Sequence, residues 1–282
     1  MNSIINTLYS NTEVLLIGIL SSILATLFVL ITNKLFNKFI DTLPANKLFN
    51  YIKNSKEECL VSQIRLRDKD LKSEFLTPIP DYSSFNPSQK QYEGRQLIPY
   101  VISAEDSNAV SMILNLLGKI GRTENIQISY IDKDWDKWEN PMFLIGGNWK
   151  TTRVFENFNP YYVIKNDKFV IQKTGQAFYQ KNPNDDLGLI EKVYNPNTKK
   201  PIWIIIGMRG AGTSGAAYSF LKWWKIFGKL YGKKTFGFIV QFNDKEGWQN
   251  SSIISYYPNP TFIKKVVYIR TYLKLKKLIK EY

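Results

Sequence analysis

One uninterrupted apolar segment constrains this chain more than any other feature. Residues 14–33 read VLLIGILSSILATLFVLITN, with no charged side chain between Glu13 and Lys34. About 20 residues at ~1.5 Å per residue span roughly 30 Å, the hydrocarbon thickness of a bilayer. A cleaved signal peptide would need Lys or Arg before the run and a small-residue cleavage site after it, and neither is present. We therefore predict one transmembrane helix, with residues 1–33 as a membrane anchor.

The charges that flank this segment predict its orientation. Only Glu13 precedes it, whereas Lys34, Lys38, Lys47 and Lys53 follow it. Positive residues next to a membrane segment stay on the cytoplasmic side. We expect a single-pass protein of the cell inner membrane, with the N-terminus outside and the bulk of the chain in the cytoplasm.

Small and hydroxyl-bearing residues share one face of the predicted helix. Gly18, Ser21, Ser22 and Thr26 would permit close contact between membrane helices. This spacing predicts a homo-oligomer, with a pore or ion channel as the sharper interpretation. The alternative is that the hydroxyls only hydrogen-bond to carbonyls of their own helix.

The composition of the whole chain indicates a folded domain with a strong positive charge. Apolar residues make up 44% of the 282 residues, which is enough for a core, and the formal net charge is +14. Such a charge favours anionic partners: a nucleotide or oligonucleotide ligand, or the lipid of an anionic membrane leaflet. The alternative is a genome whose base composition favours Lys and Asn codons.

The histidine and cysteine content excludes several classes of chemistry. The chain has no histidine, which removes Ser-His-Asp and Cys-His catalysis and imidazole metal ligands. Cys59 is the single cysteine, so no intrachain disulfide can form, as suits a reducing compartment. We expect neither a metal nor a cofactor.

The remaining chain divides into four predicted parts. Residues 34–60 form a juxtamembrane amphipathic helix that Pro44 breaks, and residues 61–96, rich in Pro and polar side chains, form a linker. Residues 97–260 form a Rossmann-like ligand-binding domain, and residues 261–282 a basic C-terminal helix. The apolar face of this C-terminal helix would carry Phe262, Val266, Ile269 and Leu273. Its partner could be anionic lipid, a polyphosphate or a neighbouring subunit, or the helix could simply pack on the domain.

The fold class predicted for residues 97–260 is α/β with a mostly parallel sheet. A helix over 105–117 starts with acidic residues, as the helix dipole favours. A second helix is expected to start near Thr213. Strands are expected at 126–131, 142–145, 187–196, 202–206 and 235–242. A strand, a glycine loop and a helix occur twice, the arrangement that builds an open α/β sheet.

Each glycine loop is a candidate anion site, because free N–H groups at a helix start attract anions. The first site would comprise Gly207, Arg209, Gly210, Gly212, Thr213 and Ser214. The second would comprise Gly146, Gly147, Asn148, Lys150, Thr151 and Arg153. Neither loop has a Walker or a complete GxGxxG motif. The alternative is that the glycines only allow tight packing of strand on helix.

The motifs of residues 97–245 resemble a known family. AEDSNAV, WxxWENPMFLIGGNW, DLGLI and IIIGMRGAGTSGAA follow one another. This order resembles the Rossmann-like C-terminal sensor domain that bacteria and archaea attach to membrane anchors or DNA-binding modules. Leu187 and Gly188 stand where that family often has Tyr. The architecture is also similar to antiphage membrane effectors gated by nucleotide or oligonucleotide signals, such as the Hailong type, and this resemblance implies a role in antiviral defence.

Three functional hypotheses follow. The leading one is a non-enzymatic membrane sensor or effector that binds an anionic ligand and controls a transmembrane oligomer. The second is a membrane-tethered hydrolase of nucleotides that uses carboxylates, for which Glu105, Asp106, Asp185 and Asp186 are the candidates. The third is a non-catalytic scaffold.

Overall fold

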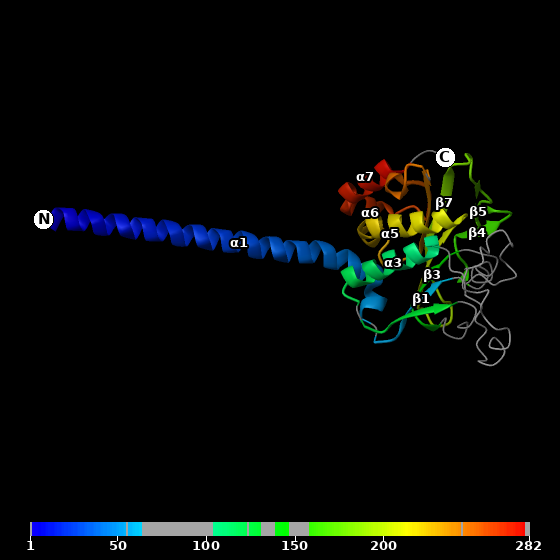
Figure 1. Ribbon diagram of the computed structural model, residues 1–282, viewed down its shortest axis with the longest axis horizontal. Helices are drawn as coiled ribbons and strands as arrows, with labels where there is room; N and C mark the ends of the chain where they lie inside the picture. The colour runs from blue at the N-terminus through cyan, green and yellow to red at the C-terminus, as the bar shows by residue number, and fades with distance from the viewer. Residues whose placement is uncertain are drawn as a thin grey trace, which may run out of the picture.

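The computed structural model describes residues 2–54, 56–63, 104–122, 124–130, 139–146, 158–243 and 245–279. A 53-residue helix, α1 (Asn2–Asn54), projects from an α/β domain as a long rod (Figure 1). The window Ile17–Lys34 is the one described helical stretch that is long and apolar enough to cross a membrane, with a mean hydropathy of 1.7. Its large apolar side chains are between 48% and 68% exposed, so nothing within the described chain covers them.

The domain is built on a seven-stranded sheet in the order β10-β9-β7-β8-β3-β1-β2. Its strands are β1 (Cys59–Gln63), β2 (Ile126–Tyr130), β3 (Met142–Ile145), β7 (Asp185–Tyr194), β8 (Pro201–Gly207), β9 (Phe236–Asn243) and β10 (Ser252–Tyr257). Strands β1, β2, β3, β8 and β9 run in one direction, and β7 and β10 run in the other. The α/β class and the mostly parallel sheet are thus confirmed.

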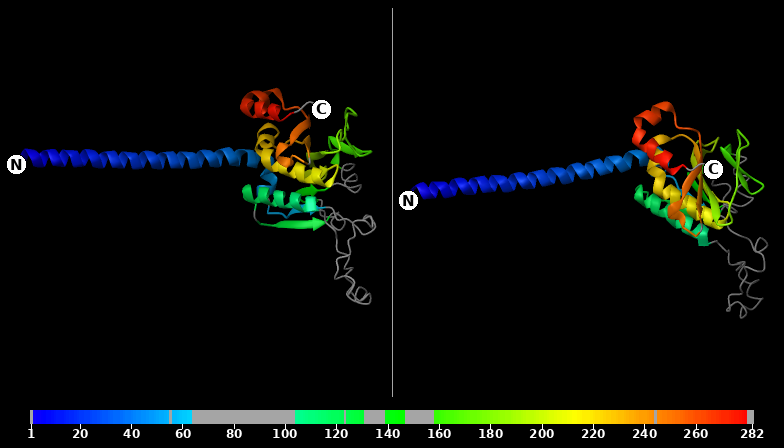
Figure 2. Two further views of the ribbon diagram at one scale, coloured as in Figure 1. Left: turned by 45° about the horizontal axis from the view of Figure 1, so that its top comes forward. Right: turned by 90° about the horizontal axis from the view of Figure 1, so that it is seen from above.

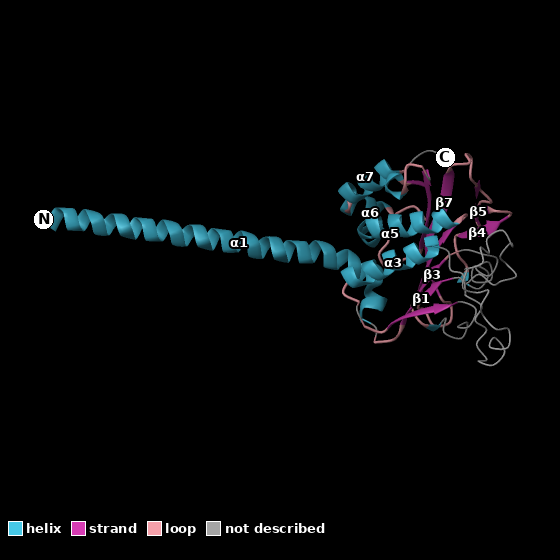
Figure 3. Cartoon of the chain, in the orientation of Figure 1, coloured by secondary structure: helices cyan, strands magenta, loops and turns pink. Residues whose placement is uncertain are grey.

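Helices cover one face of this sheet and a small second sheet covers the other (Figure 3). The helical layer consists of the last turns of α1, α3 (Ala104–Lys119) and α5 (Gly210–Leu230). The second sheet contains β4 (Tyr162–Lys165), β5 (Lys168–Ile171) and β6 (Ala177–Phe178). A hydrophobic core lies on each face of the large sheet, and alternate residues of β8 pack into the two cores. Trp203 faces the helices and Ile204 faces the small sheet. Burial on both faces explains the continuous apolar run of this strand.

Two predicted boundaries are wrong. Strand β1 lies within the stretch assigned to the juxtamembrane helix and the linker, yet it pairs with both β2 and β3 near one end of the sheet. The CLVSQ segment is only five residues long, so its own sequence pattern is weak, and long-range pairing makes it a strand. Helix α1 continues through Pro44 instead of breaking there. Among the α1 side chains whose burial is described, Ala45 is the first hydrophobic one in the core.

The basic C-terminal helix is also different from the prediction. It forms two short helices, α6 (Phe262–Val267) and α7 (Ile269–Leu278), separated at Tyr268, whose backbone leaves the helical region. The predicted apolar face is exposed, because Tyr272, Leu275 and Leu278 turn toward the domain instead. The start of α5 is at Gly210, three residues before the predicted Thr213.

Glu191 of β7 is fully buried between the two sheets. Its carboxylate accepts hydrogen bonds from the backbone N–H groups of Tyr161 and Tyr162, which join the small sheet to the large one. Burial raises the pKa of Glu191 to about 8, although these two donors act in the opposite direction. The folded protein therefore holds a proton on Glu191 at pH values where the unfolded chain has lost it.

We predict that Glu191→Gln removes a pH-dependent loss of stability. The folded pKa lies above the unfolded one, so the contribution of Glu191 to stability falls as the pH rises from about 4.5 to about 8. The slope is at most about 1.4 kcal/mol per pH unit. Urea unfolding in detergent micelles, with wild type and variant compared at each pH from 5 to 7, measures it. Parallel pH profiles for the two proteins would contradict the prediction.

Candidate functional site

The glycine loop after β8 lies against the start of β7 and does not present the open anion site that we expected. The N–H of Gly212, in the first turn of α5, donates to the carboxylate of Asp186 at 2.6 Å. Asp186 is buried, and its other oxygen accepts from the N–H of Leu187 at 2.7 Å. The protein's own carboxylate therefore occupies the position at the helix dipole where a phosphate would bind.

The hydroxyl groups of this loop are also engaged within the domain. Thr213 accepts a hydrogen bond from the N–H of Gly207 at 3.1 Å, and Ser214 donates to the carbonyl of Glu105 at 2.7 Å. Gly212, Thr213 and Ser214 are buried. These residues join β7, β8, α3 and α5, which agrees with the packing alternative for the glycines.

Arg209 and Gly210 are the exposed members of the first predicted site. Arg209 donates to the carbonyl of Pro183 at 3.3 Å. A side chain at Gly210 would meet the carboxylate of Glu105 at 3.2 Å. An acidic neighbour disfavours anions at this end of the helix.

One residue of the second predicted site lies in the described chain. Gly146 follows β3 with φ of +88°, and a Cβ there would lie 2.9 Å from a carboxylate oxygen of Asp106. Gly147, Asn148, Lys150, Thr151 and Arg153 lie outside the described residues.

The four carboxylates proposed for catalysis converge on this same edge of the sheet. Asp185 accepts hydrogen bonds from the side-chain amides of Asn182, Gln241 and Asn243. Asp186 caps α5, so both of these β7 carboxylates have structural partners. Glu105 and Asp106 lie half-buried in the first turn of α3, where the helix dipole stabilises them.

An open basic pocket of about 490 Å³ lies where α1 meets α3 and α5. Its cations are Lys119 from the last turn of α3 and Lys222 and Lys225, three residues apart on α5. Thr42, Ala45, Ile120, Leu221 and Trp224 complete the lining. Lys222 also donates to the carbonyl of Gln249 at 3.1 Å, and the ammonium of Lys225 lies 5.6 Å from the ring centre of Trp224.

Sequence reasoning missed this pocket. The signal within the sequence was the LKWWK segment of α5, in which two lysines flank a pair of buried tryptophans. The third lysine is contributed by α3, more than a hundred residues earlier, and only the packing of the helices brings it close.

Two buried basic side chains fix the end of α1 in the domain. Arg122 donates to the carbonyl of Ile52 at 3.0 Å and to the carbonyl of Glu57. The ammonium of Lys192 donates to the carbonyls of Leu48 at 3.1 Å and Gly232 at 3.3 Å. Ile52 is one of the last four residues of α1, whose carbonyls lack intrahelical partners, and a cation suits such a carbonyl. Burial, with a smaller effect of the Lys233 charge, lowers the pKa of Lys192 to about 7.

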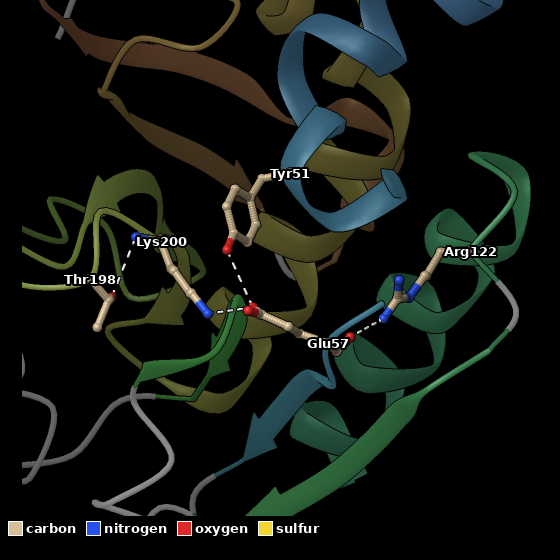
Figure 4. A network of polar contacts seen from close by, with 5 residues as sticks. All are labelled: Tyr51, Glu57, Arg122, Thr198 and Lys200. Carbon is tan, nitrogen blue, oxygen red and sulfur yellow. Dashed lines mark hydrogen bonds and ion pairs between the residues drawn. The ribbon is translucent and has the colours of Figure 1, made fainter. Parts of the chain in front are cut away.

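A network of polar contacts at the turn after α1 also holds the end of this helix against the domain (Figure 4). The Glu57 carboxylate accepts a hydrogen bond from the Tyr51 hydroxyl at 3.2 Å and forms an ion pair with Lys200. The backbone N–H of Lys200 in turn donates to Thr198. The end of α1 is thereby tied to the turn between β7 and β8.

The predicted pore residues lie on an exposed part of α1. The hydroxyl of Ser21 donates to the carbonyl of Gly18 at 2.9 Å, and that of Thr26 donates to the carbonyl of Ser22 at 2.8 Å. These hydroxyls therefore have partners within their own helix, as the alternative interpretation held. A Cβ added at Gly18 would meet nothing within 4 Å, so this surface is free for another helix.

We predict that Gly212→Ala destabilises the domain by roughly 1–3 kcal/mol, because the added methyl group overpacks a rigid site. Its Cβ would lie 2.3 Å from the carbonyl oxygen of Leu187 and 2.7 Å from the Cα of Gly207. Gly118→Ala in α3 is the matched control, since a Cβ there has open space. Urea unfolding of both variants in detergent measures the difference. An equal midpoint for the two would show that the loop is loosely packed.

No family model matches the sequence, and no curated protein matches it significantly.

Proposed function

We propose that the chain is a single-pass membrane protein whose α/β domain binds an anionic ligand in the pocket between α1, α3 and α5. The exposed apolar window Ile17–Lys34 supports the membrane-spanning role, because such a surface is costly in water. The lysines that follow this window support a cytoplasmic domain and an N-terminus outside.

The chemistry of the pocket carries the proposal. Lys119, Lys222 and Lys225 provide three positive charges around one cavity, and no described carboxylate lines it. Trp224 and Ile120 add an apolar wall. Ammonium groups around an apolar wall suit a phosphate attached to a base, so a nucleotide or a short oligonucleotide is the proposed class of ligand.

The pocket also provides a route from ligand to membrane. Thr42 and Ala45 belong to α1, the helix that continues into the apolar window. A ligand that contacts α1, α3 and α5 together would favour one position of α1 relative to the domain. Because α1 is continuous, any change at its buried end would move the membrane segment as well.

The sheet supports a Rossmann-like assignment for this domain. Its parallel half has the order β2-β1-β3-β8, which corresponds to the 2-1-3-4 order of doubly wound folds. With the resemblance to antiphage membrane effectors, these features support a sensor whose α1 helices assemble into an oligomer when ligand binds.

The first test is ligand binding by the full-length protein in nanodiscs, measured by calorimetry at low salt with nucleotides and short DNA or RNA oligomers. We expect Lys119, Lys222 and Lys225 changed together to Gln to weaken binding about tenfold or more, because a loss of ~1.4 kcal/mol in contacts suffices for that. The control changes Lys165, Lys173 and Lys245 to Gln, an equal loss of charge on exposed positions outside the pocket.

Two results would contradict the proposal. Absence of binding by every anionic ligand would remove the receptor function. Equal weakening in the pocket variant and in the control would show that only the overall charge attracts the ligand.

The second test concerns the membrane segment. We expect Ser21, Ser22 and Thr26 changed together to Leu to abolish membrane permeabilisation while ligand affinity stays within about twofold, since membrane helices pack through small and polar residues. Dye release from proteoliposomes measures permeabilisation. A full-length protein that is monomeric in nanodiscs, both with and without bound ligand, would exclude the channel and leave the anchor.

A further inference from the structure

The hairpin of α6 and α7 exposes an unusual amount of apolar surface. Outside the α1 window, ten large apolar side chains are exposed in the described chain, and six of them lie between positions 262 and 273. These six are Phe262, Ile263, Val266, Val267, Ile269 and Leu273. Phe262 and Ile263 are 79% and 72% exposed. Exposed apolar side chains at this density mark an interaction surface.

Cations surround these side chains. Lys264, Lys265, Arg270, Lys274, Lys276 and Lys277 belong to the same two helices. No acidic residue occurs between Thr261 and Ile279. The tyrosines between the lysines anchor the hairpin to the domain, since Tyr268 and Tyr272 pack against the core.

The hairpin lies at the end of the domain from which α1 emerges. All three views place α6 and α7 on this side, while the small sheet lies at the opposite end (Figures 1 and 2). The ammonium of Lys47 in α1 donates to the hydroxyl of Tyr268 at 2.7 Å, which ties the two elements together.

We propose that the α6–α7 surface docks on the anionic headgroups of the membrane that α1 enters. About ten residues, or ~15 Å of helix, separate Lys34 from Pro44. Headgroups fill about 5–7 Å of this gap, and membrane helices tilt by about 20° on average. A tilt of α1 toward α6–α7 brings the hairpin down to the headgroups, where apolar side chains enter the interface and cations contact lipid phosphates.

Lipid fits this surface better than a second copy or a nucleic acid. A second copy would present the same six cations, which repel one another. A nucleic acid would contact the cations but leave the aliphatic side chains Ile263, Val266, Val267 and Ile269 in water. A bilayer interface accommodates both kinds of side chain at once.

The experiment places a polarity-sensitive fluorophore on Val266→Cys in the full-length protein. Burial raises the pKa of Cys59, the single native cysteine, to about 12, so the new thiol reacts selectively. We expect a blue shift in nanodiscs of phosphatidylcholine and phosphatidylglycerol that is absent in phosphatidylcholine alone. The shift should decrease when salt reduces the Debye length from about 10 Å to about 3 Å.

Matched variants distinguish docking from a general effect of charge. Lys264, Lys265, Lys274 and Lys277 changed to Gln should abolish the shift, whereas Lys165, Lys173, Lys199 and Lys245 changed to Gln should preserve it. The same fluorophore on Gln172→Cys, in the turn between β5 and β6 of the far small sheet, should not respond. The pocket variant of Lys119, Lys222 and Lys225 should keep the shift, because the hairpin acts independently of ligand.

The inference rests on the membrane-spanning role proposed for α1, and carbonate extraction of liposomes tests that role separately. Release of the chain into the supernatant overturns the spanning role and with it the docking. Retention with equal spectra in neutral and anionic lipid overturns the docking alone. A shift that depends on two chains per nanodisc, or on added DNA or RNA, assigns the surface to a second copy or to nucleic acid and also overturns it.

Discussion

The embedding of the last turns of α1 in the domain core is the constraint on which the other features depend. Phe49 of α1 is fully buried and packs on the rings of Trp203, Phe220 and Trp224. A helix end leaves its final carbonyls without partners, so a buried end needs donors from elsewhere. Arg122, from the turn after α3, donates to the carbonyl of Ile52 in the last turn, and Lys192 of β7 donates to the carbonyl of Leu48 one turn earlier. The rod and the domain are consequently coupled, since a displacement of the buried end of α1 displaces the rod as well.

This attachment places the charged groups of the domain at two opposite ends. Among the described residues, three carboxylates, those of Glu105, Asp106 and Asp186, gather near the carboxyl ends of β3 and β8, although the chain as a whole is strongly basic. The end at which α1 emerges carries the basic pocket and the cationic hairpin. Such a separation gives the domain a charge asymmetry, and the field of a protein acts through the position of its charges and not only through their sum.

The glycine loop illustrates how closely related sequence patterns lead to different structures. A strand, a glycine-rich turn and a helix start are common to phosphate-binding loops and to tight structural turns. The residue that makes this loop a structural turn is Asp186. It lies 26 positions before Gly212, so it is not part of the local sequence pattern. Its carboxylate satisfies the helix start, and Gly188 allows α5 to approach β7 closely, since a Cβ there would lie 2.5 Å from the carbonyl of Gly212.

The sequence by itself determined the apolar window of α1, the α/β class and the main strands from Ile126 to Phe242, because these depend on the spacing of apolar residues within one segment. It also determined that histidine chemistry is absent. Only the tertiary structure decided that Cys59–Gln63 is a paired strand, that Pro44 lies inside a continuous helix and that the C-terminal helix divides at Tyr268. Packing between distant segments also closed the loop at Gly212 and placed Lys119 and Lys222 in the same pocket. Strand pairing and charge proximity depend on residues far apart in the chain, and no local pattern specifies them.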